Sequence, residues 1–218
     1  LKTPVGVRLS GTTVQIGGVG EAPYTNNWPE AEGPEKAFDG SQDTKYLNFV
    51  GSNAGLIFSP YNSIYAGRLT TLNFFTANDE EGRDPTSYIL YGSSVDLYNK
   101  GPGTTYSTTD MTLIASGTVS LPSARRQAGG VGFINENVYK SYLVVFPTVK
   151  NGDTGMTQIS GLLGFFTPMV KVDKSSLILR AEYGNGSSDV QSFNVSTLGI
   201  LPDNPIVTAP PNFEVSLN

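Results

Sequence analysis

Oxygen-bearing groups crowd into one short stretch of the chain, EKAFDGSQDTKYLNF at residues 35–49. Asp39 supplies a carboxylate, Thr44 supplies a hydroxyl and a carbonyl, and the backbone near Lys36 and Ser41 supplies further carbonyls. Calcium takes about six to eight oxygen ligands, so the stretch is a candidate calcium site. The alternative is a type I turn in which the side chains of Asp39 and Thr44 bond nearby amides.

An aromatic and amide-rich segment precedes this turn. Residues 21–34 hold few core candidates, and the single tryptophan of the chain stands among them. A flat aromatic face can stack on the apolar face of a sugar ring while amides bond the sugar hydroxyls. The candidate glycan-binding residues are Tyr24, Asn26, Asn27 and Trp28. The alternative is a surface loop that its tryptophan tucks onto the fold.

Two adjacent arginines add to this candidate site. The planar guanidinium groups of Arg125 and Arg126 can each donate two hydrogen bonds to a hydroxyl or to an acidic sugar. The alternative for this pair is a solvated loop. A structural role is expected for the sequence Arg83-Asp84-Pro85, in which Arg83 pairs with a carboxylate.

The sequence contains no cysteine and no histidine. Cysteine nucleophiles, Ser-His-Asp triads, zinc sites of the Cys/His type and histidine pH switches are therefore excluded. Glycoside hydrolysis by paired carboxylates needs two of them facing each other across about 5–10 Å, and no sequence pattern indicates such a cleft. We expect a protein without enzymatic activity.

The composition is typical of an all-β protein. Charged residues make up 15% of the chain, aromatic residues 11%, and there are 25 Gly and 14 Pro, as in short strands joined by many turns. The net charge of −5 provides no basic surface for nucleic acid. No apolar run approaches the ~20 residues that span a bilayer. We therefore expect neither nucleic-acid binding nor membrane insertion.

Alternating apolar residues predict half-buried antiparallel strands. Residues 5–19 are expected to form two short strands or one bent strand, with Gly11 between the halves. The continuous apolar run from Tyr142 to Phe146 predicts a central strand covered on both faces, which Pro147 ends.

The pattern changes after Pro168. Residues 169–183 and 190–195 are predicted to pair as a β-hairpin around a turn at 184–186. An isolated hairpin is marginal in water, so we expect it to pack on the main domain or on another copy of the protein. The Pro-rich tail that follows, residues 202–218, is expected to be held by some contact.

Residues 35–49 resemble a segment of the galactose-binding-like, or discoidin-like, family of β-sandwich domains, which is related to carbohydrate-binding modules. A second matching block, TANDEEGRDPTSYILYGS at 76–93, follows at the distance typical of the family. Shorter matches continue in order: TLIASG (112–117), LPSARRQAG (121–129), YLVVFPTVKN (142–151) and TQISGLLGFF (157–166). The resemblance implies an antiparallel β-sandwich, a jelly roll, over residues 1–168. The hairpin and tail, residues 169–218, then form an appendage for packing or assembly.

The resemblance also implies the calcium site. Related sequences usually carry a Glu directly after a Gln-Ile pair in the last strand, whereas here Gln158-Ile159 is followed by Ser160. One carboxylate ligand is therefore missing, and calcium is expected as a structural ion if it binds. The residues assigned to the metal are Lys36, Asp39, Ser41, Thr44 and Ser160.

The family includes binders of sugars, lipids and proteins as well as structural modules, so the fold does not fix the function. One hypothesis is a non-catalytic carbohydrate-binding or adhesion module, displayed within a larger assembly, whose partner is a glycan or polysaccharide. The other is a purely structural subunit of an extracellular filament, surface layer or virion. Such a subunit would associate with copies of itself or with a partner structural protein through residues 169–218.

Both hypotheses place the protein outside the cell, at a cell surface or at a virion surface. The chain begins at Leu1 rather than Met, from which we expect a processed product or a fragment of a longer protein.

Overall fold

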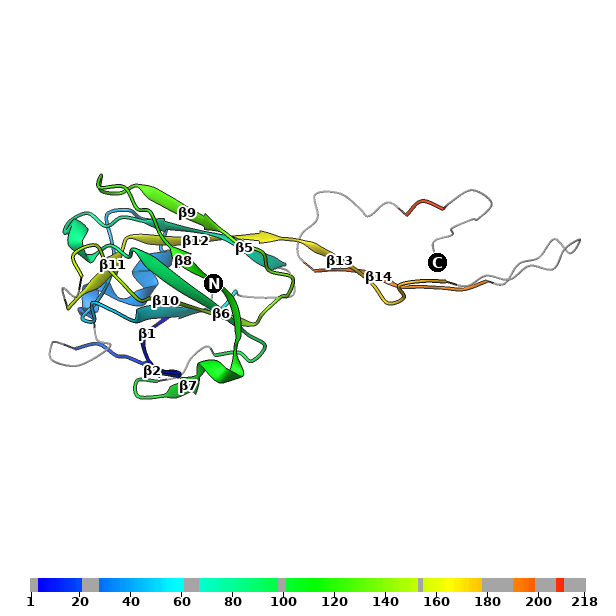
Figure 1. Cartoon of the computed structure of the whole chain (residues 1–218), viewed down its shortest axis with the longest axis horizontal. Helices are drawn as coiled ribbons and strands as arrows, with labels where there is room; N and C mark the ends of the chain where they lie inside the picture. The colour runs from blue at the N-terminus through cyan, green and yellow to red at the C-terminus, as the bar shows by residue number, and fades with distance from the viewer. Residues whose placement is uncertain are drawn as a thin grey trace, which may run out of the picture.

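The computed structural model describes residues 4–20, 28–60, 67–97, 101–152, 155–177, 190–198 and 207–209. Within these ranges the chain forms β-strands and short 3-10 helices, and the paired strands run antiparallel (Figure 1). No helix in the described part of the chain is long and apolar enough to cross a membrane. The predicted all-β class is confirmed.

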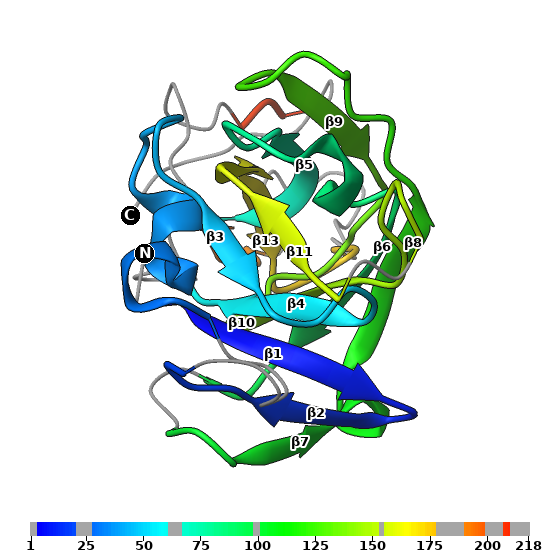
Figure 2. The same ribbon diagram turned by 90° about the vertical axis from the view of Figure 1, so that its left-hand side faces the viewer.

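Two sheets face each other as the layers of a sandwich, seen from one end in Figure 2. The larger sheet has seven strands in the order β7-β2-β1-β4-β10-β6-β8. In chain order these are β1 (Val5–Ser10), β2 (Thr13–Ile16), β4 (Ala54–Phe58), β6 (Ser87–Ser93), β7 (Thr105–Ser107), β8 (Thr112–Thr118) and β10 (Ser141–Phe146).

The smaller sheet has three strands in the order β12-β5-β9, and a separate strand pair lies beside it. The three strands are β5 (Arg68–Phe75), β9 (Ala128–Gly132) and β12 (Gly161–Thr167). The separate pair is β3 (Tyr46–Asn48) and β11 (Thr157–Ile159). Short 3-10 helices lie in the connections: η1 (Glu30–Glu32), η2 (Pro34–Phe38), η3 (Glu81–Arg83) and η4 (Thr108–Asp110). The predicted antiparallel β-sandwich is confirmed.

Strand β10 lies between two hydrophobic clusters. Alternate residues of β10, among them Tyr142 and Val144, point into the main core between the sheets. Leu143 and Val145 point to the other face, into a second cluster that includes Leu97. Every residue of β10 is buried, so the central strand predicted from the apolar run is confirmed.

The first strands form a tight hairpin. β1 and β2 pair from Val7 with Ile16 to Ser10 with Thr13, and Gly11 takes a φ of +58° in the turn. Such a positive φ is accessible to glycine at little cost. Of the two arrangements expected for residues 5–19, the two-strand form is therefore the one observed.

After Pro168 a two-stranded antiparallel pair forms, β13 (Met169–Val172) with β14 (Val195–Leu198). It begins where the predicted hairpin begins, but the predicted second strand, residues 190–195, shares only Val195 with β14. The predicted turn at 184–186 lies outside the described residues. The pair forms a two-stranded sheet of its own and extends away from the sandwich (Figure 1). Strand β12 leads directly into β13, with Pro168 between them. The hairpin therefore does not extend either sheet of the sandwich.

Candidate functional site

The turn predicted to bind calcium is closed by its own side chains. The backbone N–H of Ser41 donates to Asp39 Oδ1 at 2.9 Å, and Thr44 Oγ1 donates to Asp39 Oδ2 at 2.7 Å. Lys36 Nζ lies 3.9 Å from the same Oδ2. These are the hydrogen bonds expected for the alternative to a metal site, a turn stapled by Asp39 and Thr44.

The hydroxyl of the fifth predicted ligand is engaged in another hydrogen bond. Ser160 is buried and donates from Oγ to the carbonyl of Thr76 at 2.9 Å. Asp39 supplies the one carboxylate of the predicted set, and both of its oxygens already accept hydrogen bonds. Among the described residues, no group of three or more acidic side chains is placed to hold a metal ion. This donor set fits calcium poorly, and calcium binding stays a prediction.

The tryptophan of the predicted sugar platform belongs to the hydrophobic core. Trp28 is 8% exposed and meets Tyr46 edge-on, with ring centroids 6.2 Å apart. Its ring lies over Gly6, where an added Cβ would come within 2.5 Å of Trp28 Cζ3. A ring enclosed in this way offers no free face to a sugar. It packs onto the fold, as the alternative hypothesis of a loop held by its tryptophan expects. The other three platform residues, Tyr24, Asn26 and Asn27, lie outside the described residues.

Arg125 is committed to a buried carboxylate. It binds Asp84, which is 0% exposed, through two parallel hydrogen bonds, Nη1 to Oδ1 at 3.0 Å and Nη2 to Oδ2 at 2.6 Å. Lys150 Nζ lies 3.2 Å from the same Oδ2. The Nη1 and Nη2 groups of Arg125 are therefore engaged by Asp84, whereas its neighbours Ala124 and Arg126 are exposed, as the alternative of a solvated loop expects. Arg83, which was expected to pair with a carboxylate, acts on a different one: its charge helps to lower the pKa of Asp79.

A second network of hydrogen bonds and ion pairs fixes the neighbouring loop, which carries the acidic residues Asp79, Glu80 and Glu81. Lys45, itself buried, places Nζ 2.6 Å from Asp79 Oδ2 and 3.7 Å from Glu32 Oε1. Gln158 donates to the carbonyls of Asp79 and Glu80 at 3.1 and 3.0 Å. These bonds hold the acidic loop against β11, so the loop is not freely solvated.

Two carboxyl groups of this loop have lowered pKa values. Partial burial raises the pKa of Asp79, but the hydrogen bond and charge of Lys45 bring it below its usual value. Hydrogen bonds from Ser123 and Lys150 lower the pKa of Glu81. Both groups are therefore stabilised as carboxylates.

Arg126 remains available at the surface. Its backbone has a φ of +61°, unusual for a residue with a side chain, and its Nε donates to Asp43 Oδ1 at 2.9 Å. The side chains of Arg126 and Asp43 are 47% and 82% exposed. This pair ties the 39–44 turn to the loop before β9.

A cleft of about 400 Å³ opens beside this turn, along the edge strand β12. Aromatic rings form much of its wall, where the ring centroids of Phe38 and Phe58 lie 5.6 Å apart. Three polar side chains, Ser41, Gln42 and Ser160, also line it. The full lining is Ala37, Phe38, Gly40, Ser41, Gln42, Phe58, Phe75, Ser160, Gly161, Leu162, Leu163, Gly164 and Phe166.

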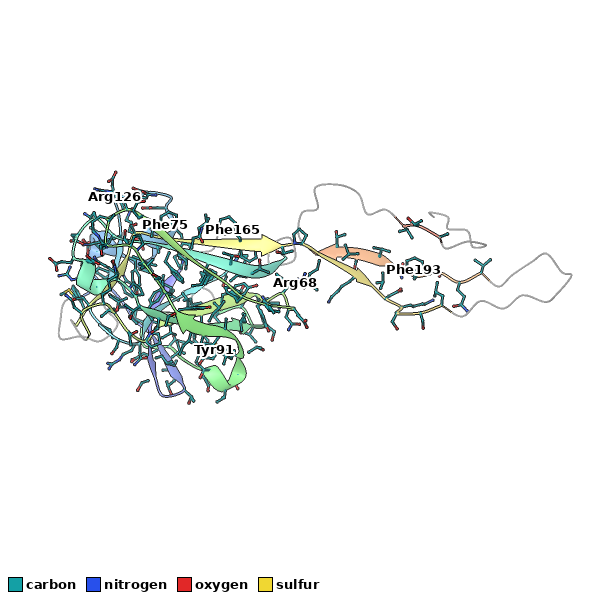
Figure 3. All side chains as sticks on the ribbon, turned by 45° about the horizontal axis from the view of Figure 1, so that its top comes forward. Arg68, Phe75, Tyr91, Arg126, Phe165 and Phe193 are labelled. Atoms are coloured by element: carbon teal, nitrogen blue, oxygen red, sulfur yellow. The ribbon has the colours of Figure 1, made fainter. Side chains whose placement is uncertain are left out.

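Phe75, and not the predicted Trp28, is an aromatic residue that lines this cleft. Its ring is half-buried, and it lies against Gly161, where an added Cβ would come 3.1 Å from the ring. Figure 3 shows Arg126 and Phe75 near the same end of the sandwich, with Phe165 further toward the β13–β14 pair. Sequence reasoning missed Phe75, although its neighbour Thr76 begins the second family-like block. The wall residue Phe38 and Gln42 both belong to the first block.

No protein-family model and no curated protein matches this sequence. Solved structures resemble its fold at low identity. The family 32 carbohydrate-binding module of Clostridium perfringens NanJ, solved with galactose, is 14% identical with a TM-score of 0.44; the match covers 62% of this chain and 85% of that one. A family 32 module from a family 31 glycoside hydrolase of Clostridium perfringens is 15% identical with a TM-score of 0.49, covering 67% and 90%.

A family 62 module of Clostridium thermocellum Xyl5A is 20% identical with a TM-score of 0.46, and the match covers 73% of this chain and 96% of that one. These likenesses concern the fold. Each of these structures is a carbohydrate-binding module, and the likeness is one of fold alone.

Proposed function

We propose that this protein is a non-catalytic carbohydrate-binding module displayed within a larger extracellular or virion-surface assembly. The cleft beside β12 is the glycan site, and the observation that supports it is the partly buried ring of Phe75 in the same cleft as the polar side chains of Ser41 and Gln42. The volume of the cleft, about 400 Å³, is in the range of small-ligand sites.

The chemistry of this cleft suits a sugar ring better than a charged metabolite. Aromatic faces contact the apolar C–H face of the ring, while an amide and hydroxyls bond its hydroxyl groups. Gln42 is exposed and the Asp43–Arg126 pair lies next to it in the turn, so further donors and acceptors stand at the mouth. Of the residues assigned to glycan binding from the sequence, Arg126 is retained in this proposal.

We propose no catalytic role for the cleft because its lining lacks the groups that acid–base or nucleophilic chemistry would use. The chain has no histidine or cysteine. The carboxylates Asp79, Glu81 and Asp84 lie in the connection between β5 and β6, which we call the loop end of the sandwich, and each is paired with a lysine or an arginine. A glycosidase needs two carboxyl groups facing the scissile bond.

A glycan array with the full chain, followed by titration of the best ligand, tests the proposal. We expect Phe75→Ala to weaken binding about tenfold, because a stacked ring contributes roughly 0.5–1.5 kcal/mol beyond its buried area. Phe165→Ala is the matched control, since Phe165 is 47% exposed on β12 but does not line the cleft. An array without any ligand, or equal losses in both variants, would contradict the proposal.

A second candidate function is a purely structural subunit that attaches to its neighbours through the ribbon formed by β13 and β14. The observation that favours it is the exposure of Val170 and Val172, at 54% and 53%, on a sheet separate from the sandwich. One chain can perform both functions, because the cleft and the ribbon are different parts of the molecule.

A further inference from the structure

Arg126 has a backbone conformation that a residue with a side chain seldom adopts. Its φ of +61° lies in the left-handed region, which glycine occupies at little cost. Among the described residues, Asn53 is the other non-glycine residue with a positive φ, and asparagine tolerates this region better than arginine does. Glycine would suit the backbone at position 126, so the arginine there indicates a role for its side chain.

Thr76 holds the backbone around Arg126 in place. The carbonyl of this buried threonine accepts a hydrogen bond from the N–H of Arg126 at 3.1 Å, and its own N–H donates to the carbonyl of Gln127 at 2.9 Å. Its hydroxyl donates to the carbonyl of Ala124 and accepts from the N–H of Gln127, both at 2.9 Å. These four bonds lie on both sides of Arg126, so its side chain leaves the loop at a fixed point.

That point lies beside the cleft, near the end of the sandwich where Figure 3 labels both Arg126 and Phe75. Phe75 lines the cleft and pairs with Ala128 of β9. Arg126 comes two residues before Ala128, which makes it a diagonal neighbour of Phe75, at about 7–8 Å and within reach of a long side chain. On its other side, Arg126 Nε donates to Asp43, which follows the cleft-lining residues 40–42.

Arg125 shows how a guanidinium group of this loop divides its donors. Its Nε donates to the carbonyl of Ser123 at 3.2 Å, while its Nη1 and Nη2 bind the two carboxylate oxygens of Asp84. The Nε of Arg126 is likewise occupied, by Asp43, and the side chain is 47% exposed. The Nη1–Nη2 edge of Arg126 therefore offers a ligand the geometry with which the same edge of Arg125 binds a carboxylate.

We propose that the glycan bound at the cleft carries a carboxylate, and that Arg126 selects it by donating from Nη1 and Nη2 to the two carboxylate oxygens. This inference rests on the proposed function and names its substrate class, an acidic sugar. The described residues that line the cleft include no charged side chain, so they contact the sugar ring and its hydroxyl groups. Arg126, at the mouth, binds the charged substituent.

Asp43 limits the affinity of this site for an acidic sugar. Its carboxylate accepts the bond from Arg126 Nε and so orients the guanidinium group, but its negative charge repels a carboxylate on the ligand. An asparagine keeps an acceptor oxygen and loses the charge. Asp43→Asn should therefore strengthen the binding of an acidic glycan about threefold and leave the binding of a neutral glycan unchanged.

Titration calorimetry of the full chain with two matched pairs of glycans tests the proposal. Oligogalacturonate and its methyl ester differ in carboxylates within a chain, whereas sialyllactose and lactose differ in a carboxylate at a chain end. We expect the acidic member of one pair to bind about tenfold tighter than its neutral partner, because a bidentate bond to a charged group is strong, and that pair identifies the source of the carboxylate. No preference for the acidic member in either pair would overturn the proposal.

Two variants assign the preference to its residue. Arg126→Gly removes the guanidinium group, and glycine adopts the observed φ without strain. This variant should lose the preference for the acidic glycan while its Tm stays within about 3 °C of the wild-type value, since the lost ion pair is exposed. Lys171→Ala, which removes the same charge from the exposed strand β13, should keep the preference. A preference that survives in Arg126→Gly, or that falls equally in Lys171→Ala, would overturn the proposal.

The failure of this inference and the failure of the proposed function give different results. Phe75→Ala should weaken both members of a pair alike, because the ring contacts the sugar whether or not it is charged. Binding of neutral glycans that depends on Phe75 and not on Arg126 would overturn the acidic substrate class and leave the cleft as the glycan site. A chain that binds no glycan at all would contradict the proposed function itself.

Discussion

The loop end of the sandwich and the β13–β14 ribbon differ in which side chains they bury and which they expose. At the loop end, charged side chains form ion pairs at buried or partly buried positions, as in the contact of buried Asp84 with Arg125 and Lys150. On the ribbon, valines point outward without a covering layer. The charged groups of the loop end find partners within the chain, whereas Val170 and Val172 of the ribbon are about half exposed.

Removing the buried carboxylate should have the largest effect on this comparison. Asp84→Ala leaves the guanidinium of Arg125 and the ammonium of Lys150 without their shared partner, and their side chains are only 20% and 18% exposed. Breaking a buried ion pair from one side costs about 3–5 kcal/mol. We expect the free energy of unfolding to fall by this amount, as measured by urea unfolding followed by fluorescence.

Asp43→Ala is the matched control for that experiment. Its bond to Arg126 is an exposed ion pair, which contributes at most about 1 kcal/mol. If the two substitutions destabilised the protein equally, burial would not be what distinguishes the loop end.

Acid should weaken the loop end by an intermediate amount. The pKa values of Asp79 and Glu81 lie below their usual values of 3.8 and 4.5 in the folded protein. A carboxyl group with a lowered folded pKa stabilises the fold at pH values above its unfolded pKa. That stabilisation is lost as the pH falls through the folded pKa, because the unfolded chain binds the proton first.

We therefore expect Tm to be level near neutral pH and to fall below about pH 4.5. Thermal unfolding by circular dichroism across a pH series measures this. Asp79→Asn should make the fall shallower, since it removes one of the titrating groups. A fall of unchanged steepness in that variant would assign the acid sensitivity to other carboxylates.

Calcium should have the smallest effect. The 39–44 turn is already closed by the bonds of Asp39 with Ser41 and Thr44, so an ion would add little. If calcium binds as the family resemblance implies, millimolar calcium raises Tm by an amount that corresponds to about 1 kcal/mol or less in the free energy of unfolding. Asp39→Asn should then abolish the rise in differential scanning calorimetry. A wild-type Tm that does not respond to calcium would exclude the predicted site.

The fold could be predicted because its signals are local. The apolar run of β10, the alternation around Gly11 and the pattern change after Pro168 each lie within a few residues, and each specifies a strand or a turn directly. The two family-like blocks then placed these strands in a β-sandwich. The start of β13 was found for the same reason, whereas β14 begins at Val195, the last residue of the predicted second strand.

The candidate site was harder to predict because its contacts join distant residues. Asp84 meets a guanidinium 41 residues away. The burial of Trp28 depends on Gly6, which has no side chain to hold the indole off the sheet. Trp28 and Phe75 are both large aromatic residues in the sequence, and only the packing around them shows that one is core and the other lines a cleft.

The direct continuation of β12 into β13 has a mechanical consequence. If the ribbon is the attachment point, a force that pulls the sandwich from its assembly enters the body along the axis of β12. Seven residues of β12 are paired with β5, and antiparallel ladder bonds lie perpendicular to the strands. The pull therefore loads these bonds together in shear and cannot peel them apart one by one. The body would resist extraction most strongly along the direction in which it is held.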